Sequence, residues 1–328
     1  MVASMNIGII GAGAIGLRRA LALPETMRLV AVYDPSEDAL KRFAERCRTN
    51  YTVASTSDSI FNDGTIDAVI VATPHSFLVD HAISALQKGK HCLVEKPAGV
   101  NRSEIQSLAR EADQAGKTVR VGFNHRFHPS IILAKRLLRE EGMGQLMHVR
   151  GVYGHGGRIG YESEWRAKRS ISGGGELVDQ GSHLIDLINH LFGVTALEYS
   201  SLRTSFWNMT VEDNVFLALR LKDEAMAWLH ASWTEWRNLF RLEMSFKYAR
   251  VDIHGLGRSY GTERLTLHKM GSDMGPPKTS NWSFPESDPS WKLEMQSFYN
   301  AVNGESDGCA TLDDVLTTWD VIEGAYTQ

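Results

Sequence analysis

Short runs of apolar residues alternate with amphipathic stretches over the first 123 residues. The runs lack the regular polar alternation of a strand with one face in water, so each is typical of a strand buried on both faces. The expected strands cover 6–10, 29–33, 67–72, 91–94 and 118–121, and the expected helices cover 13–23, 36–47, 77–88 and 101–115, with Ser36 as an N-cap. Because strands and helices alternate with short connections, this part predicts a doubly wound parallel sheet.

The rest of the chain is expected to place strand after strand, joined by short polar turns. Strands are expected at 145–153, 215–221, 225–233 and 239–246, helices at 130–140, 178–192, 290–303 and 312–325, and a loop at 271–289, which holds four prolines. Consecutive strands of this kind indicate an antiparallel sheet. We therefore predict an α/β protein of two domains, 1–123 with the parallel sheet and 124–328 of α+β type, whose terminal helices can pack back on the first domain.

Composition and charge narrow the class of protein. The 328 residues are 43% hydrophobic and 23% charged, as in an ordinary globular protein, and 35 basic against 39 acidic residues give a net charge of −4. This charge favours neither nucleic acid nor a membrane surface as partner. Three scattered cysteines, no signal-peptide pattern and no long apolar run predict a soluble, cytoplasmic protein.

A glycine motif follows the first expected strand directly and opens the first helix. Its residues are Gly11, Ala12, Gly13, Ala14, Ile15 and Gly16. In this context the glycines provide a tight turn, close approach of the backbone to a pyrophosphate and close helix–strand packing, while the helix N-terminus attracts the phosphates. The motif predicts a Rossmann dinucleotide site, with Gly11, Gly13, Ala14, Ile15 and Gly16 in contact with the cofactor.

Asp34 lies 18 residues after Gly16, at the end of the second expected strand. A carboxylate there can accept hydrogen bonds from the ribose hydroxyls and would repel a 2′-phosphate, which favours NAD over NADP. The alternative is that Asp34 is a turn residue before Pro35.

Four further motifs resemble those of the glucose–fructose oxidoreductase/inositol dehydrogenase family, abbreviated Gfo/Idh/MocA. They are Ala72-Thr73-Pro74-His75-Ser76, Glu95-Lys96-Pro97, the stretch from Gly122 to Pro129, and the stretch from Gly173 to Asp186. The resemblance runs from residue 6 to about 193. It implies a Rossmann domain followed by an α+β domain with a large open sheet that often serves oligomerisation. It also implies oxidation or reduction of a secondary alcohol or ketone on a sugar, a cyclitol such as inositol, or a nucleotide-linked sugar.

The resemblance carries roles for single residues. Thr73, Pro74, Glu95 and Lys96 match cofactor-contacting positions, and His75 stands where the family usually has asparagine, which puts its own contact in doubt. Further candidates are Asn124 for the cofactor and Arg126, Arg158, Trp165 and Arg166 for the substrate.

The resemblance also implies a catalytic set of Lys96, Asp179 and His183. Removing a hydride from an alcohol requires loss of the hydroxyl proton, and His183 is suited to accept it because a free imidazole titrates near neutrality. Asp179 lies four residues earlier on an expected helix, where it can orient His183 or bind substrate. Lys96 can donate to the substrate oxygen, although it could also share or exchange roles with His183.

Several other interpretations stay open at this point. Asp179, His183, Asp186 and His190 have helical spacing, but we expect no metal there, because Asp186 and His190 can satisfy each other or the backbone. Arg158, Arg166 and Arg169 either receive an anionic group or are solvated, and Trp207 is a candidate for stacking on a sugar ring. A glycoside hydrolase that uses bound NAD for transient oxidation and a non-enzymatic sugar or redox sensor are the competing functions. The expected partners are a carbohydrate-type small molecule and further copies of the chain, as a homodimer or homotetramer formed through the second sheet.

Overall fold

The computed structural model describes residues 4–139 and 142–328, so the last residue of the helix expected at 130–140 lies outside the described residues. The chain forms two compact units, one made of residues 1–124 and 291–316 and the other of residues 125–290 and 317–328. The segment 291–316, which the domain prediction counted with the second half, therefore belongs to the first unit. Within the described residues, no helix is long and apolar enough to cross a bilayer.

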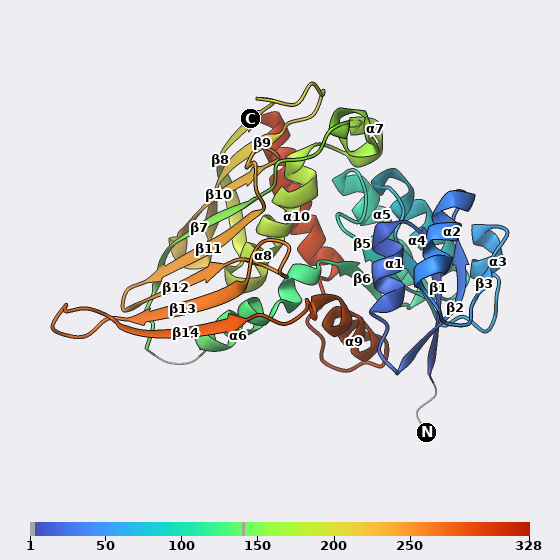
Figure 1. Ribbon diagram of the computed structural model, residues 1–328, viewed down its shortest axis with the longest axis horizontal. Coiled ribbons are helices and arrows are strands. Elements are labelled where there is room, and N and C mark those ends of the chain that lie inside the picture. The colour runs from blue at the N-terminus through green and yellow to red at the C-terminus, as the bar shows by residue number, and fades with distance from the viewer. Residues whose placement is uncertain (1–3, 140–141) are drawn as a thin grey trace. The chain divides into compact units, whose positions relative to one another are not determined.

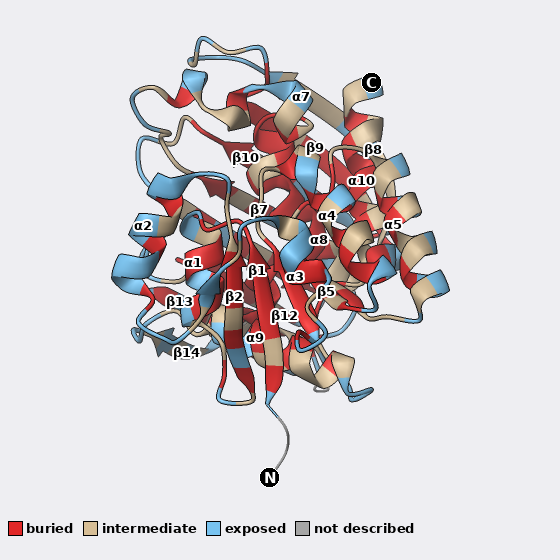
Figure 2. Ribbon diagram, turned by 90° about the vertical axis from the view of Figure 1, so that its right-hand side faces the viewer, coloured by how far each residue is buried: buried red, intermediate tan, exposed pale blue. Residues whose placement is uncertain are grey.

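The first unit is built on a six-stranded sheet in the order β3-β2-β1-β4-β5-β6, with every strand pair parallel. Its strands are β1 (Met5–Ile10), β2 (Met27–Tyr33), β3 (Thr52–Val53), β4 (Ala68–Val71), β5 (His91–Glu95) and β6 (Val119–Gly122). Every residue of β4 is buried, and Figure 2 shows buried residues along β1 and β2. Burial on both faces explains why these strands read as nearly continuous apolar runs.

Crossover helices connect the strands of the first unit. They are α1 (Ala14–Leu21), α2 (Glu37–Arg46), α3 (Ser57–Phe61), α4 (Leu78–Gln87) and α5 (Arg102–Ala115), with the 3-10 turn η1 (His75–Phe77) before α4. The expected N-cap is confirmed, because the Ser36 hydroxyl accepts the Ala39 N–H at 3.3 Å. The short elements α3 and β3 were not predicted, since five and two residues are too few to show a period.

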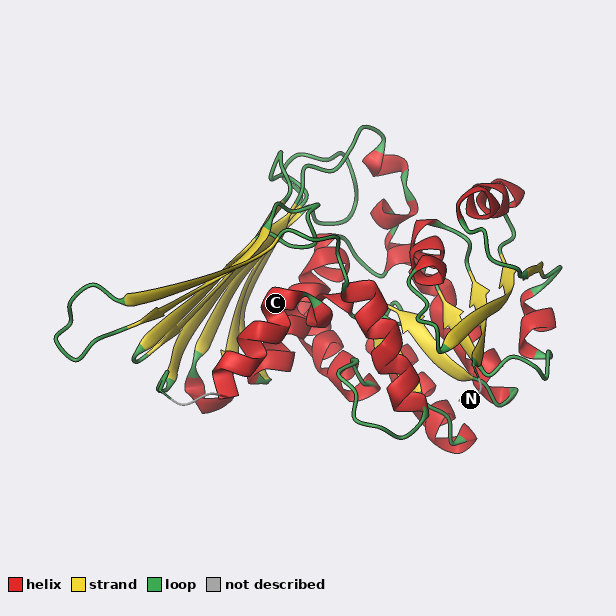
Figure 3. Ribbon diagram, turned by 60° about the horizontal axis from the view of Figure 1, so that its bottom comes forward, coloured by secondary structure: helices red, strands yellow, loops and turns green. Residues whose placement is uncertain are grey.

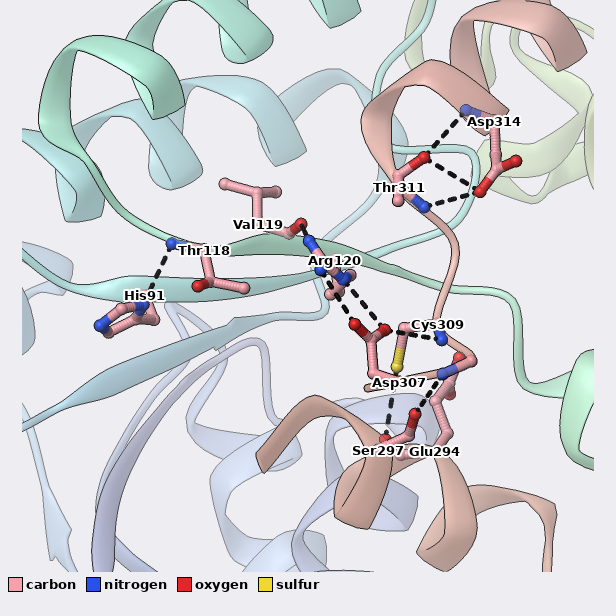
Figure 4. A network of polar contacts seen from close by, with 11 residues as sticks. His91, Thr118, Val119, Arg120, Glu294, Ser297, Asp307, Cys309, Thr311 and Asp314 are labelled. Carbon is pink, nitrogen blue, oxygen red and sulfur yellow. Dashed lines mark hydrogen bonds and ion pairs between the residues drawn. The ribbon is translucent and has the colours of Figure 1, made fainter. Parts of the chain in front are cut away.

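Helix α9 (Ser290–Val302) and the segment that follows it are fastened to β6 by polar contacts (Figure 4). The Arg120 side chain of β6 binds the Asp307 carboxylate at 3.1 and 3.0 Å, and the Val121 N–H donates to the Ala310 carbonyl at 3.0 Å. In the same region Ser297 accepts the Gly308 N–H at 2.8 Å. These contacts join residues about 190 positions apart in sequence to the edge of the parallel sheet.

The second unit is built on an eight-stranded sheet in the order β14-β13-β12-β11-β7-β10-β9-β8. Its strands are β7 (Leu146–Gly154), β8 (Val194–Arg203), β9 (Asn214–Leu221), β10 (Met226–Ser232), β11 (Leu239–Phe246), β12 (Ala249–His254), β13 (Glu263–Lys269) and β14 (Lys278–Phe284). Only β7 and β10 pair in parallel, so the predicted mostly antiparallel sheet is confirmed.

One face of this sheet is covered by helices and the other is open (Figures 1 and 3). The covering helices are α6 (Pro129–Arg139), α8 (Ser182–Phe192) and the part of α10 (Leu312–Thr327) that belongs to this unit. Strand β10 shows the alternation that results, because Ala227 and Leu229 are buried while Met226 and Trp228 are exposed.

Strand β14 lies inside the stretch that was expected to be a loop. Pro276, Pro277 and Pro285 flank the strand instead of interrupting it, and β14 pairs only with β13 at the edge of the sheet. The polar residues of an edge strand face water, which is why this segment resembles a loop in its composition.

Candidate active site

The glycine motif forms the turn between β1 and α1. Gly11 has a φ of +101°, and a Cβ on this residue would lie 2.5 Å from the Ala72 carbonyl oxygen. A Cβ on Gly16 would lie 1.9 Å from the Gly11 oxygen, so helix and turn approach too closely for any side chain. Gly13 differs, because it is exposed and a Cβ there would meet nothing within 4 Å. Gly11 and Gly16 are therefore required by the fold, whereas Gly13 leaves open space at the helix N-terminus.

Asp34 follows β2 and faces the same turn. Its carboxylate accepts the Ala12 N–H at 2.8 Å and the Ser36 N–H at 2.8 Å. The turn interpretation of Asp34 is thus correct, and the same side chain also holds the glycine loop in place. The open space at Gly13, the N-terminus of α1 and the carboxylate of Asp34 fit the phosphates and a ribose of a dinucleotide.

The other candidate cofactor residues lie at the same edge of the sheet. Strand register places the last residues of β1 and β4 side by side, and likewise those of β5 and β6. Thr73 and Pro74 follow β4, Lys96 follows β5, and Asn124 follows β6, while His75 is buried at the start of η1. Ligands of open parallel sheets bind at this carboxyl edge.

Lys96 is half-buried and precedes a cis peptide bond to Pro97. Its neighbour Glu95 accepts a hydrogen bond from the Arg19 side chain of α1 at 2.6 Å, and Arg19 also pairs with Glu294 of α9. The Arg19 side chain is completely buried and its guanidinium lies 4.6 Å from the centre of the Trp291 ring. Burial alone would lower the pKa of Arg19, but Glu294 and Glu95 outweigh it and raise the pKa well above its usual value. Glu95 thus has a structural partner and braces the start of the Lys96 loop.

Asp179 lies on a π-helical turn, η5 (Leu177–Gly181), that leads into α8. The expectation of a regular α-helix from residue 178 is therefore wrong at its first turn. Wider turns of this kind occur frequently at functional sites. The Asp179 carboxylate lies 3.6 Å from the Arg166 guanidinium, a separation that allows an ion pair but no close hydrogen bond.

Two residues that sequence reasoning did not single out hold the start of this turn. The Glu212 carboxylate accepts the Gly175 and Leu177 N–H groups at 3.0 Å each and the Tyr326 hydroxyl at 2.8 Å. A Cβ on Gly175 would lie 2.2 Å from the Glu212 carbonyl oxygen. These contacts explain the glycine at position 175, and burial raises the pKa of the Glu212 carboxyl despite the hydrogen bonds that it accepts.

His183 lies on α8, is buried, and stacks on the ring of His125 with 3.8 Å between ring centres and 23° between ring planes. His125 in turn contacts the Tyr153 hydroxyl through Nε2 at 3.0 Å. Neither His125 nor Tyr153 was identified as a partner of His183 from sequence, because strand β7 and the 3-10 turn η2 (Asn124–Phe127) are far from α8 along the chain.

Two other polar side chains of the helix contact residues outside it. Asp186 binds Arg126, with distances of 2.5 and 2.8 Å, and His190 contacts Lys135 at 2.8 Å. Neither Arg126 nor Lys135 was predicted as a partner from the sequence. Arg126, a candidate for substrate binding, is buried and engaged by Asp186.

The remaining arginine candidates also have partners. Arg158 binds Glu164 through two hydrogen bonds of 2.7 and 2.6 Å, and Arg166 lies 4.5 Å from the centre of the Trp165 ring. Arg169 lies 4.4 Å from the centre of the Tyr326 ring. Trp207 packs against Gly157 and donates to the Trp233 carbonyl at 3.0 Å, so it is part of an aromatic cluster.

The parallel sheet with its glycine turn defines a dinucleotide-binding protein of the Rossmann class. Residues 5–123 match an oxidoreductase family described as having an NAD-binding Rossmann fold, and residues 131–255 match the GFO/IDH/MocA C-terminal domain. The chain belongs to the Gfo/Idh/MocA family of oxidoreductases, as the sequence motifs predicted.

Characterised proteins share parts of this sequence. Levoglucosan dehydrogenase of Pseudarthrobacter phenanthrenivorans is 31% identical over 209 residues, which cover 58% of this chain and 52% of that protein. An NADP(+)-dependent scyllo-inositol 2-dehydrogenase of Bacillus subtilis is 34% identical over 137 residues, which cover 42% of this chain and 38% of that protein. A solved structure of levoglucosan dehydrogenase with NADH and levoglucosan has a TM-score of 0.86 at 22% identity, with 99% of this chain and 98% of that chain covered. The chain thus spans about half or less of these relatives by sequence, while the fold is shared throughout.

Proposed function

We propose that this protein is an NAD(P)-dependent oxidoreductase that acts on a secondary alcohol or ketone of a sugar, cyclitol or nucleotide-linked sugar. The observation that carries the proposal is the carboxyl edge of the first sheet, where the open glycine turn, Asp34 and Lys96 follow β1, β2 and β5. The family match over both halves and the dehydrogenase names of the relatives support it.

We propose the same three catalytic residues that the motifs implied. Lys96 donates a hydrogen bond to the substrate oxygen and favours its anionic form, and His183 accepts the hydroxyl proton during oxidation. Asp179 orients substrate or His183. A bound nicotinamide cofactor would supply the acceptor for the hydride of the carbinol carbon. In the reverse direction His183 returns the proton to the oxygen.

NAD is the proposed cofactor, ahead of NADP. Asp34 presents a carboxylate where a 2′-phosphate would otherwise lie, and no arginine directly follows it, since the next residues are Pro35 and Ser36. NADP stays the alternative, since one relative is named for NADP(+) while levoglucosan dehydrogenase was solved with NADH.

Within the proposed substrate class, we favour an uncharged sugar or cyclitol over a sugar acid or a nucleotide diphosphate. Arg158 is neutralised by the two-point contact with Glu164, and Arg126 is neutralised by Asp186. Arg166 lies between two carboxylates, at 3.8 Å from Glu164 and 3.6 Å from Asp179. Such pairing lowers the net positive charge that an anionic substrate would need.

We further propose a cytoplasmic homodimer or homotetramer formed through the open face of the eight-stranded sheet. On that face Trp228 and Tyr199 are about half exposed and stack in parallel, with ring centres 6.1 Å apart. Exposed aromatic residues of this kind are typical of subunit interfaces. Light scattering of the full chain and of a Trp228→Glu variant tests this, and a monomeric wild-type protein would contradict it.

A screen of neutral sugars, sugar acids, cyclitols and nucleotide sugars by NADH absorbance, with NADP in parallel, tests the activity. We expect net NADH formation with a neutral polyol, whereas glycoside cleavage without net reduction would favour the hydrolase alternative. Lys96→Met and His183→Ala should each reduce turnover by at least about a hundredfold, the usual effect of losing an acid–base group. Lys88→Met, at an exposed position at the end of α4, is the matched control. Full turnover in either active-site variant would contradict the assigned roles.

A further inference from the structure

The rings of His125 and His183 form a buried stack of two imidazoles. Their centres are 3.8 Å apart and both residues are more than nine-tenths buried, with exposures of 7% and 6%. A stack at this distance leaves no room for water between the rings. Water therefore does not screen a positive charge on one ring from the other ring.

Contacts with neighbouring residues hold the His125 ring in this position. Its Nε2 contacts the Tyr153 hydroxyl at 3.0 Å, and the Tyr153 ring packs 4.9 Å from the Tyr260 ring. The Tyr260 hydroxyl accepts from Gln180 of the π-helical turn at 2.8 Å. These contacts link His125 to β7 and back to the turn that carries Asp179.

The next residue along the chain fixes the register of the stack. Arg126 binds Asp186 at 2.5 and 2.8 Å, and Asp186 lies three residues after His183 on α8. Successive residues of η2 therefore engage positions on one side of the helix, His125 against His183 and Arg126 against Asp186. This pair of contacts explains why the Asn-His-Arg-Phe motif and the Ser-His-Leu-Ile-Asp motif occur in the same chain.

Several charged and titratable groups lie near the two stacked rings. His128 lies edge-on to His125 at 5.4 Å, and its Nδ1 is 3.1 Å from Glu263 and 3.7 Å from Asp288. From β7, Tyr153 lies 6.2 Å from the His183 ring, and from β11 the apolar ring of Phe240 lies 6.5 Å from the His125 ring. Burial, together with Tyr260, Asp179 and Glu176, raises the pKa of Tyr153, so its hydroxyl is neutral at ordinary pH.

Two charged imidazoles at this distance repel each other strongly. At an effective dielectric constant of 20 the energy is about 4 kcal/mol for unit charges 4 Å apart. The stack therefore binds one proton far more readily than two, and the two rings titrate as a coupled pair.

We propose that His125 is a positioning residue for His183, which holds the His183 ring by stacking and, by taking the one proton that the pair binds readily, disfavours protonation of His183. This inference rests on the proposed role of His183 as the acid–base group. An uncharged imidazole is the form that can accept the hydroxyl proton of an alcohol. The stack therefore keeps the His183 imidazole uncharged at a lower pH than an apolar ring in the place of His125 would.

The test is an NMR titration of the full chain labelled with isotopic histidine, in the wild type, His125→Phe and His125→Gln. Phenylalanine keeps a flat ring in the stack but attracts a protonated imidazole instead of repelling it. We expect the His183 titration midpoint to rise by about one pH unit in His125→Phe, a tenfold gain in proton affinity. His125→Gln keeps a donor toward Tyr153, removes the second ring, and should shift the midpoint in the same direction.

Two further variants support the titration. His183→Gln identifies the His183 signal, and His254→Phe, at an exposed position at the end of β12, serves as control.

Activity and stability provide the second readout. The acidic limb of kcat/KM against pH should move upward with the NMR midpoint in both His125 variants, with more effect on kcat than on KM. An unchanged His183 midpoint in both variants overturns the proposal. A loss of thermal stability with no change in the midpoint or in the pH profile of kcat/KM also overturns it. Because the titration needs no substrate, a failed sugar screen with a shifted midpoint would instead contradict the proposed function. If His125→Phe does not fold, His125→Gln gives the same decision.

Discussion

Arg126 and Asp186 form a two-point ion pair inside the second unit, with nitrogen–oxygen distances of 2.8 and 2.5 Å and side-chain exposures of 4% and 0%. The pair joins the 3-10 turn η2 to the helix that carries His183. Because this pair engages two donors of the guanidinium, it favours a structural role for Arg126 over substrate recognition.

Arg126→Met should therefore affect stability more than substrate affinity. Removing the cation takes the two-point partner from the buried Asp186 carboxylate, which costs about 3–5 kcal/mol of the free energy of unfolding. Urea denaturation measures this cost. The double variant Arg126→Met with Asp186→Leu should recover much of it, because the buried charge is gone. A large rise in KM with unchanged stability would show that Arg126 contacts substrate after all.

The glycine turn predicts opposite outcomes for two alanine substitutions. Gly13→Ala places its Cβ in open space with extended backbone, so the free energy of unfolding should change by less than about 0.5 kcal/mol. The same methyl group would enter the space that we assign to the phosphates, and NAD affinity should fall at least about tenfold, or roughly 1.4 kcal/mol.

Gly16→Ala is the matched comparison. Its Cβ would lie 1.9 Å from the Gly11 oxygen, so the turn and α1 must separate and the protein should lose about 1–3 kcal/mol of stability together with NAD binding. Calorimetric titration and thermal unfolding of both variants distinguish the two effects. Equal stability losses in the two variants would refute this account of the turn.

The parallel sheet was predictable from sequence because burial on both faces leaves uninterrupted apolar runs, and the dinucleotide turn was predictable because its positions 11 and 16 admit no side chain. Partners of buried charges were not predictable. Arg19 meets Glu95 over a separation of 76 residues and Glu294 over 275, and nothing local marks either carboxylate as its partner. The π-helical turn at Asp179 was missed for the same reason, since Glu212 and Tyr326, which hold it, are distant in sequence.

Asp34→Asn should shift cofactor preference toward NADP. The amide keeps one acceptor for the Ala12 or Ser36 N–H but lacks the negative charge, so repulsion of a 2′-phosphate disappears. We expect the ratio of kcat/KM for NADP to that for NAD to rise about tenfold, with a stability loss of about 1 kcal/mol from the weakened acceptor. Asp38→Asn, at an exposed position on α2, should leave the ratio unchanged. An unchanged ratio in Asp34→Asn would mean that other residues select the nucleotide.

Arg19→Met should produce a protein whose stability depends on pH in a way that the wild type does not. In this variant the buried Glu95 and Glu294 carboxylates lose the guanidinium that pairs with both, and burial then raises their pKa values in the folded state. A carboxyl whose folded pKa is raised stabilises the fold below its unfolded pKa, about 4.3, and loses that contribution as pH rises through the folded value. The loss of unfolding free energy relative to wild type should therefore be about 3–5 kcal/mol at pH 8 and smaller at pH 5.

Urea denaturation at both pH values measures this loss, and Arg18→Met, which removes an exposed neighbour on the same helix, is the control. A deficit that stays constant between the two pH values would show that Arg19 stabilises the Lys96 loop by packing on Trp291 and not by neutralising the two carboxylates.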